Sequence, residues 1–385
     1  MHDNLYIDTP QRLAALCRRL EGRPWLALDT EFLRDKSYRP RLCLLQVAAE
    51  GAVACVDPLA LDDLTPLLDL LYDPSIVKVL HSAYQDLEIF YYLRGAPPRP
   101  VFDTQIAALL AGHGDQIGYA ALVQALLEVK LDKAHTRTDW SRRPLQPEQL
   151  QYAADDVRYL GPLYLRLRDE LEHRGRLAWL QEDFTALTDP ATYANPPGTA
   201  WRRIRGAERL TDAQFAVLAA LAAWREQTAQ RSDRPRQWIL SDDCLLELAR
   251  HRPASLEKLA GIRGLKPGTL DKYGAELLEL IRSGRHAPAA ARPERRPPPP
   301  SAVEPLVDVL MAVVRLRGAQ IGISPATLAN RKELEQLAAG DEAVGVLHGW
   351  RKGVVGADLQ AVLSGAAGLR VEDGALRIEY LKPAE

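Results

Sequence analysis

The chain has 385 residues, of which 47% are hydrophobic and 26% charged, with a formal net charge of -2. This length favours two or three domains, and the composition is that of a globular protein, which excludes a fibrous or disordered chain. Residues 1–200 carry a net -7, residues 201–288 a net +5 and residues 289–385 a net zero. A carboxylate-lined site beside an anion-binding module would divide the charge in this way, and so would ordinary solvated faces.

Strands and helices alternate in the first part of the chain. Short apolar runs bounded by polar or turn residues predict strands at 25–28, 42–48, 53–56 and 76–80. Apolar residues at helical spacing predict helices at 61–71, 84–92, 106–110, 119–129 and 147–172. A strand meander followed by strand–helix crossovers predicts an α/β fold with a mixed sheet flanked by helices.

The second part of the chain is predicted to be helical. Helical spacing runs from about residue 210 to 281, and it resumes at about 305 after a segment with four consecutive prolines at 297–300. Alternation in Leu369–Leu381 predicts a hairpin that turns at Asp373-Gly374. We therefore predict four segments: an α/β domain at 1–195, a helical module at 205–285, a linker at 286–304 and a second helical module at 305–385. Removing residues after 300 should weaken RNA binding less than removing the basic module, because the last module is charge-neutral and only tethered by the proline-rich linker.

Cysteine usage and the N-terminus bear on the cellular compartment. The four cysteines, Cys17, Cys43, Cys55 and Cys244, form no C-x-x-C pair and match no zinc-site spacing, which predicts reduced, buried thiols. The chain lacks a signal-peptide pattern and any apolar run long enough for a membrane span. We expect a cytoplasmic protein with no membrane association.

Carboxylates occur at three places where the predicted elements can bring them together. Asp29 and Glu31 end the first predicted strand, where residues i and i+2 share a face. Asp86 lies just inside a predicted helix, where capping would be its ordinary role. Tyr152 and Asp156 are four apart in a helix and share a face, so the adjacent Asp155 should point elsewhere.

Such a group of acids needs neutralising charge. Clustered carboxylates repel one another unless cations lie between them, and hard divalent cations prefer oxygen ligands. Two such ions can clamp the attacking and leaving oxygens of a phosphoryl displacement. Each short motif alone is weak, whereas the ordered set of three is specific.

These residues carry a family resemblance over roughly residues 1–190. Asp29-Thr30-Glu31-Phe32, His81-x-x-x-x-Asp86 and Tyr152-x-x-x-Asp156 resemble the three motifs of the DEDD exonuclease superfamily in its tyrosine subgroup. The stretch 140–145 is similar to the W-S-x-R-P-L signature of the ribonuclease D and Werner-type families, and 102–105 is similar to ribonuclease D.

The resemblance implies a ribonuclease-H-like fold and an enzyme that releases nucleoside 5′-monophosphates from a 3′ end. It implies two divalent cations, Mg²⁺ or Mn²⁺, held by Asp29, Glu31, Asp86 and Asp156, with Tyr152 positioning the attacking water. It also implies that the partners are RNA 3′ ends, with tRNA precursors as the expected substrates and the monomer as the expected form.

Three further residues are candidates for substrate binding, and each also has an alternative role within the protein itself. Phe32 is expected to stack on the terminal base or to pack in the core. His81 is expected to contact the sugar or phosphate or to be a structural histidine. Arg143 is expected to grip a phosphate bidentately, or to form a solvated pair with its neighbour.

The helical modules point to an accessory role. Residues 208–285 resemble an HRDC domain, which implies a nucleic-acid-binding module and agrees with the net +5. Residues 305–385 resemble a divergent second copy only weakly. The leading hypothesis is an exoribonuclease that acts on structured RNA, and two alternatives stay open: a Werner-type DNA exonuclease and an inactive RNA-binding scaffold. A helicase is excluded because the sequence has no G-x-x-x-x-G-K-[ST] phosphate loop.

Overall fold

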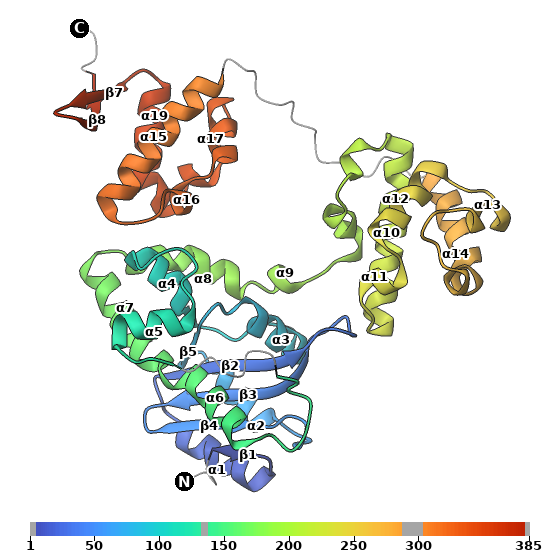
Figure 1. Cartoon of the computed structure of the whole chain (residues 1–385), viewed down its shortest axis with the longest axis horizontal. Helices are drawn as coiled ribbons and strands as arrows, with labels where there is room; N and C mark the ends of the chain where they lie inside the picture. Colours follow the sequence, from blue (N-terminus) through green and yellow to red (C-terminus); the bar gives the residue numbers. More distant parts are fainter. Residues whose placement is uncertain (1–4, 132–137, 287–302, 382–385) are drawn as a thin grey trace.

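A six-stranded mixed sheet forms the centre of the first half of the chain (Figure 1). The computed structural model describes residues 5–131, 138–286 and 303–381. The sheet has the order β1-β4-β3-β2-β5-β6, with β2, β3 and β4 antiparallel and β1, β5 and β6 joined in parallel. The strands are β1 (Tyr6–Ile7), β2 (Trp25–Leu33), β3 (Arg41–Ala49), β4 (Ala52–Val56), β5 (Val77–Leu80) and β6 (Val101–Asp103). The four predicted strands and the mixed sheet are confirmed; β1 and β6 are additional, because two or three residues show too little alternation to be predicted.

Helices cover both faces of the sheet. Leu26 and Leu28 of β2 pack into one core with α1 (Pro10–Leu20), α2 (Thr65–Leu71) and α3 (Tyr84–Arg94). Ala27, between them, packs on the other face with α4 (Thr104–Ala111), α5 (Tyr119–Leu127) and α7 (Leu160–His173), and α6 (Pro147–Arg158) lies over β3 and β4 on this face. Alternation along β2 therefore decides which helices each of its side chains can meet.

The predicted helix at 147–172 is two helices. α6 ends at Arg158 and α7 begins at Leu160, with Tyr159 between them at φ -101° and ψ -2°. Pro162 cannot donate a hydrogen bond to the carbonyl of Arg158, and its ring crowds that carbonyl, so a continuous helix is not possible here. The break sets the direction of α6 independently of α7.

The next segment is helical and touches the α/β domain. After α7, η2 (Leu177–Trp179), α8 (Leu180–Thr188) and α9 (Pro190–Tyr193) complete the α/β domain. The helical segment that follows comprises η3 (Pro197–Arg203), η4 (Ala207–Arg209), α10 (Asp212–Ser232), α11 (Arg236–Ile239), α12 (Asp242–His251), α13 (Leu256–Ala260) and α14 (Pro267–His286). Tyr38, from the loop after β2, is buried in the core of this segment and donates a hydrogen bond to Glu226 of α10. The backbone N–H of Arg39 donates to Asp233 at 3.0 Å.

The last segment packs on the α/β domain. It comprises α15 (Glu304–Ile321), α16 (Pro325–Leu328), α17 (Arg331–Ala338), η6 (Gly345–Leu347), α18 (Gly349–Arg351), η7 (Lys352–Gly356), α19 (Ala357–Leu363) and the hairpin β7 (Ala367–Glu372) with β8 (Ala375–Tyr380). The predicted hairpin is confirmed, with positive φ at both Asp373 and Gly374, as its turn requires.

This packing corrects the expectation that the last module is only tethered. Val307 and Leu310 of α15 share one core with Leu160 and Leu163 of α7. The rings of Trp179 and Trp350 stack at 4.5 Å between centroids and 4° between planes. The sequence indicated the proline-rich segment but not the apolar faces that meet beyond it, and most of that segment lies outside the described residues.

Two further expectations concern the compartment. Cys17, Cys43, Cys55 and Cys244 are all buried and free, as predicted. In the part of the chain that the structure describes, no helix is both long and apolar enough to cross a membrane.

A candidate active site where strand β2 meets helix α6

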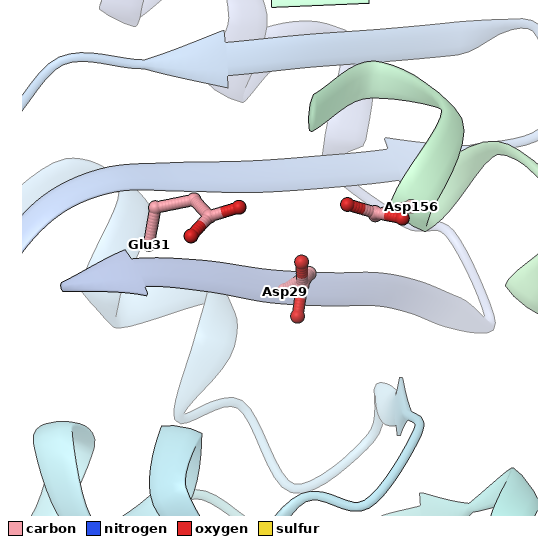
Figure 2. A group of neighbouring side chains, drawn as sticks. All are labelled: Asp29, Glu31 and Asp156. Carbon is pink, nitrogen blue, oxygen red and sulfur yellow. The ribbon is translucent and has the colours of Figure 1, made fainter. Parts of the chain in front are cut away.

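Three carboxylates converge between β2 and α6 (Figure 2). Asp29 and Glu31 continue the face of β2 that Ala27 begins, and α6 passes over this face and brings Asp156. Ligand oxygens of the three side chains all lie within 4.8 Å of one another. Each of the three is only partly buried, so the group is open to solvent.

Asp86 approaches from α3, on the opposite side of the sheet. It is buried, and the Thr30 hydroxyl donates a hydrogen bond of 2.5 Å to its Oδ1. It does not belong to the group of three within 4.8 Å. Asp86 is not a helix cap either, because the position before α3 is Ala83. Asp86 instead lies in the first turn of the helix.

The loop that carries His81 to Asp86 is held by Asp103. This buried carboxylate accepts from the backbone N–H groups of Ser82 at 3.1 Å and Ala83 at 2.8 Å, and from Gln105 at 2.8 Å. Sequence reasoning did not place Asp103 at the site. An aspartate directly before a helix is an N-cap pattern that could have indicated part of this role.

Burial raises the pKa values of all four acids, and repulsion from the other site acids adds to it for Asp29 and Glu31. Burial is the largest cause for each, and it raises the pKa of Glu31 to about 8 and those of Asp86 and Asp156 to about 7. Burial and then the charges of Asp86, Asp156 and Glu31 hold the pKa of Asp29 well above its usual range. A site with this much unbalanced negative charge favours cations, and its all-oxygen donors suit hard ions such as Mg²⁺ or Mn²⁺.

Tyr152 lies one turn before Asp156 on α6. Its ring stacks near Trp140 at 6.4 Å between centroids and 27° between planes. Burial, followed by the charges of Asp156, Glu31 and Asp29, raises the pKa of Tyr152 to about 12. The hydroxyl therefore keeps its proton at neutral pH while it lies close enough to sense all three carboxylates.

Asp155 faces away from this group, as predicted. Its Oδ1 accepts from Gln151 at 2.9 Å and from Arg158 at 2.7 Å. The two adjacent acids thus have different hydrogen-bond partners, although the charge of Asp155 adds to the raised pKa of Asp156. Asp155 is therefore a matched control for the loss of a ligand.

The structure gives other partners to the three predicted substrate contacts. Arg143 pairs bidentately with Asp57 at 2.6 Å for both bonds and also donates to the carbonyls of Trp140 and Cys43, so in this structure it clamps protein segments together. Both ring nitrogens of His81 lie within 3.0 Å of protein oxygens, on Thr104 and Ile117. Phe32 is partly buried and packs against the core on the α1–α3 face.

Comparisons with known proteins agree with this geometry. The family described as 3′-5′ exonuclease matches residues 5–172, and the HRDC domain family matches residues 214–281. The chain is 42% identical over 379 residues to ribonuclease D of Granulibacter bethesdensis, covering 97% of this chain and 95% of that protein. The chain belongs to the ribonuclease D family.

Other members of the ribonuclease D family match to a similar extent. The ribonuclease D of Acidiphilium cryptum is 42% identical over 378 residues, covering 95% of this chain and 96% of that protein. The crystal structure of RNase D from Escherichia coli, an exoribonuclease involved in structured RNA processing, superposes with a TM-score of 0.83 at 32% identity, covering 94% of this chain and 98% of that one.

Membership in the ribonuclease D family decides several predictions. The chain is a 3′–5′ exoribonuclease and therefore a hydrolase, with a ribonuclease-H-like exonuclease fold followed by a helical HRDC region. The Werner-type DNA exonuclease and the inactive scaffold are thereby set aside.

Proposed function

We propose that the chain hydrolyses RNA at this cluster of carboxylates, where Asp29, Glu31, Asp86 and Asp156 would hold two divalent cations. The convergence of three carboxylates within 4.8 Å, from two separate elements, is the observation that carries this proposal. The raised pKa values of Asp29, Glu31 and Asp156 support it, because no basic side chain among the described residues is a main cause that lowers them. Bound cations would neutralise the charge of these acids and supply an activated water for attack on phosphorus.

The protein groups around the cations would have distinct tasks. Tyr152, protonated at neutral pH, would orient the attacking water with its hydroxyl. Thr30 would hold Asp86 in one orientation through the hydrogen bond at 2.5 Å. Trp140, which is buried, would fix the Tyr152 ring through the stacking contact. Phe32, His81 and Arg143 are left out of the proposed catalytic set because the structure gives them protein partners.

The substrate we propose is a structured RNA precursor such as a tRNA with an extended 3′ end. The Escherichia coli relative acts in structured RNA processing, and here the net +5 of residues 201–288 offers an attractive surface for a folded polyanion. We further propose the division into an exonuclease domain at 1–195, an HRDC domain at 205–285, a linker at 286–304 and a second HRDC-like domain at 305–385. We also propose that the protein is monomeric and cytoplasmic.

The test is nucleotide release from a tRNA precursor, an unstructured RNA and a single-stranded DNA, each with Mg²⁺ and with EDTA. We expect 5′-monophosphates from RNA in Mg²⁺ only. Asp29→Asn should remove nearly all turnover, while the matched Asp155→Asn should be mild because Asp155 faces Gln151 and Arg158. Undiminished hydrolysis after exhaustive chelation would contradict the cation site, and equal loss in both variants would contradict the assignment of the site residues.

A further inference from the structure

Gln46 lies on β3, the strand next to β2, beside the cluster of carboxylates. In the sheet register, Gln46 of β3 pairs directly with Asp29 of β2 on one side and with Cys55 of β4 on the other. Directly opposed residues of antiparallel strands point to the same face, with their Cβ atoms roughly 4.5–5.5 Å apart. The Gln46 side chain therefore projects on the face that carries Asp29 and Glu31.

This position lies beneath α6. Leu44, two residues earlier on β3, and Cys55, opposite Gln46, both pack against Ala153 and Ala154 of α6. The same helix brings Asp156 to the site. The Gln46 amide is thus enclosed by β2, β4 and α6. It lies close to the point where the carboxylates of β2 and α6 meet.

The amide is fully buried without a partner. Gln46 has 0% exposure, and neither its Oε1 nor its Nε2 has a hydrogen-bond partner in the described structure. A buried polar group left in this state costs roughly 1–3 kcal/mol. An apolar side chain of similar volume would remove this cost, so packing alone gives no reason for an amide here.

Asp29 in turn lacks a side-chain donor. Its hydrogen bonding comes from the backbone at Thr30, and no described side chain donates to it, whereas Asp86 has the Thr30 hydroxyl. Carboxylates that bind metals are as a rule hydrogen-bonded on their outer oxygen, and these outer partners orient the ligand. The unpartnered amide of Gln46 and the Asp29 carboxylate, which has no side-chain donor among the described residues, are direct cross-strand neighbours.

We propose that Gln46 is a positioning residue that donates from its side-chain amide to Asp29 when Asp29 serves as a cation ligand. This inference rests on the proposed cation site and adds a residue to it. Gln46 acts through Asp29 and touches neither the RNA nor the reacting phosphate. Its loss should therefore weaken cation binding and lower kcat, with little change in the KM for RNA.

The experiment compares the full-length protein with Gln46→Met, which keeps the length and volume of the side chain but removes the amide. Calorimetric titration with Mn²⁺ alone should show 10–100-fold weaker binding, as for other outer partners of metal ligands. The urea midpoint in EDTA should be unchanged or higher, because an unpartnered amide has been removed. Gln46→Asn keeps an amide that is one methylene shorter, and it should weaken Mn²⁺ binding as well; it provides the same test if the Met variant does not fold.

Thr228→Val is the matched control. Thr228 is buried in α10 and its hydroxyl is also without a partner, but it belongs to the helical segment and not to the carboxylate site. This variant should leave Mn²⁺ affinity unchanged.

The possible outcomes separate the two proposals. Wild-type Mn²⁺ affinity and kcat in both Gln46 variants would overturn the role of Gln46. A wild-type protein that binds no Mn²⁺ would instead overturn the cation site itself.

Discussion

Asp156→Asn should make the metal-free protein more stable while it removes activity. The wild-type chain places Asp156 where burial raises its pKa to about 7, and its charge also raises the pKa values of Asp29 and Glu31. An asparagine fills the same space without a charge. A substitution that stabilises the fold and abolishes function is the signature of a site that is strained until a ligand binds.

The size of the effect follows from the pKa shift. A carboxyl with a pKa of about 7 in the folded chain and 3.8 in the unfolded chain destabilises the fold by roughly 4 kcal/mol at pH 8. Glu31, with a pKa of about 8, keeps its proton about half of the time at this pH and relieves part of the repulsion, so we expect a gain of about 2–4 kcal/mol.

The pH dependence has a definite sign. The folded chain binds the Asp156 proton more tightly than the unfolded chain, so wild-type stability falls as the pH rises from about 4 to 7 and levels off above. The advantage of Asp156→Asn should therefore be small at pH 4, about 1–2 kcal/mol at pH 5 and complete at pH 8.

Urea unfolding in EDTA at pH 5 and pH 8 measures this difference. Asp155→Asn is the control and should gain much less at pH 8, because the repulsion on Asp156 that it removes is offset by the weakened bonds from Gln151 and Arg158. Adding Mg²⁺ at pH 8 should raise the stability of wild type but not of Asp156→Asn, because only a ligand that binds the folded state stabilises it. If Asp156→Asn is no more stable than wild type in EDTA at pH 8, the argument that the buried charge of Asp156 destabilises the metal-free fold is refuted.

Three further predictions address the cation, the tyrosine and the domain contact. Mn²⁺ affinity, measured by calorimetry, should rise between pH 6 and 8, because the cation competes with protons on Glu31 and Asp156, whose pKa values are about 8 and 7; a flat profile would contradict this. Tyr152→Phe should lower kcat by roughly 10²–10⁴-fold in single-turnover assays if the hydroxyl acts in proton transfer, with an unchanged urea midpoint, and wild-type turnover would exclude that role. Trp350→Ala should lower the free energy of unfolding by about 2–3 kcal/mol in urea titrations, since it removes the stack on Trp179, and no loss would show that the last segment is only tethered.

The sequence alone predicted correctly those features that depend on residues close together in the chain. Alternation along β2 correctly placed Asp29 and Glu31 together, and helical spacing correctly turned Asp156 toward them and Asp155 away. The break at Tyr159 was missed although its cause, Pro162, lies only three residues away, because the apolar spacing continues across it.

Contacts between distant segments could not be predicted in this way. Arg143 pairs with Asp57, 86 residues away, and nothing in the sequence indicated this ion pair. Gln46 became a candidate only once the register of β2 and β3 was known, since a shift by one residue would turn it to the opposite face. The docking of the last segment likewise depends on apolar faces that match only in three dimensions.

The core that α7 shares with α15 has a consequence for proteolysis. A cut between residues 286 and 303 would break the chain but leave the shared apolar core, the Trp179–Trp350 stack and the hydrogen bond from Arg176 to the carbonyl of Ile321. The two fragments would stay together as a non-covalent complex, and they would separate only when denaturant exposes that core. Size-exclusion chromatography of a nicked sample would thus report one particle, whereas denaturing electrophoresis would report two chains.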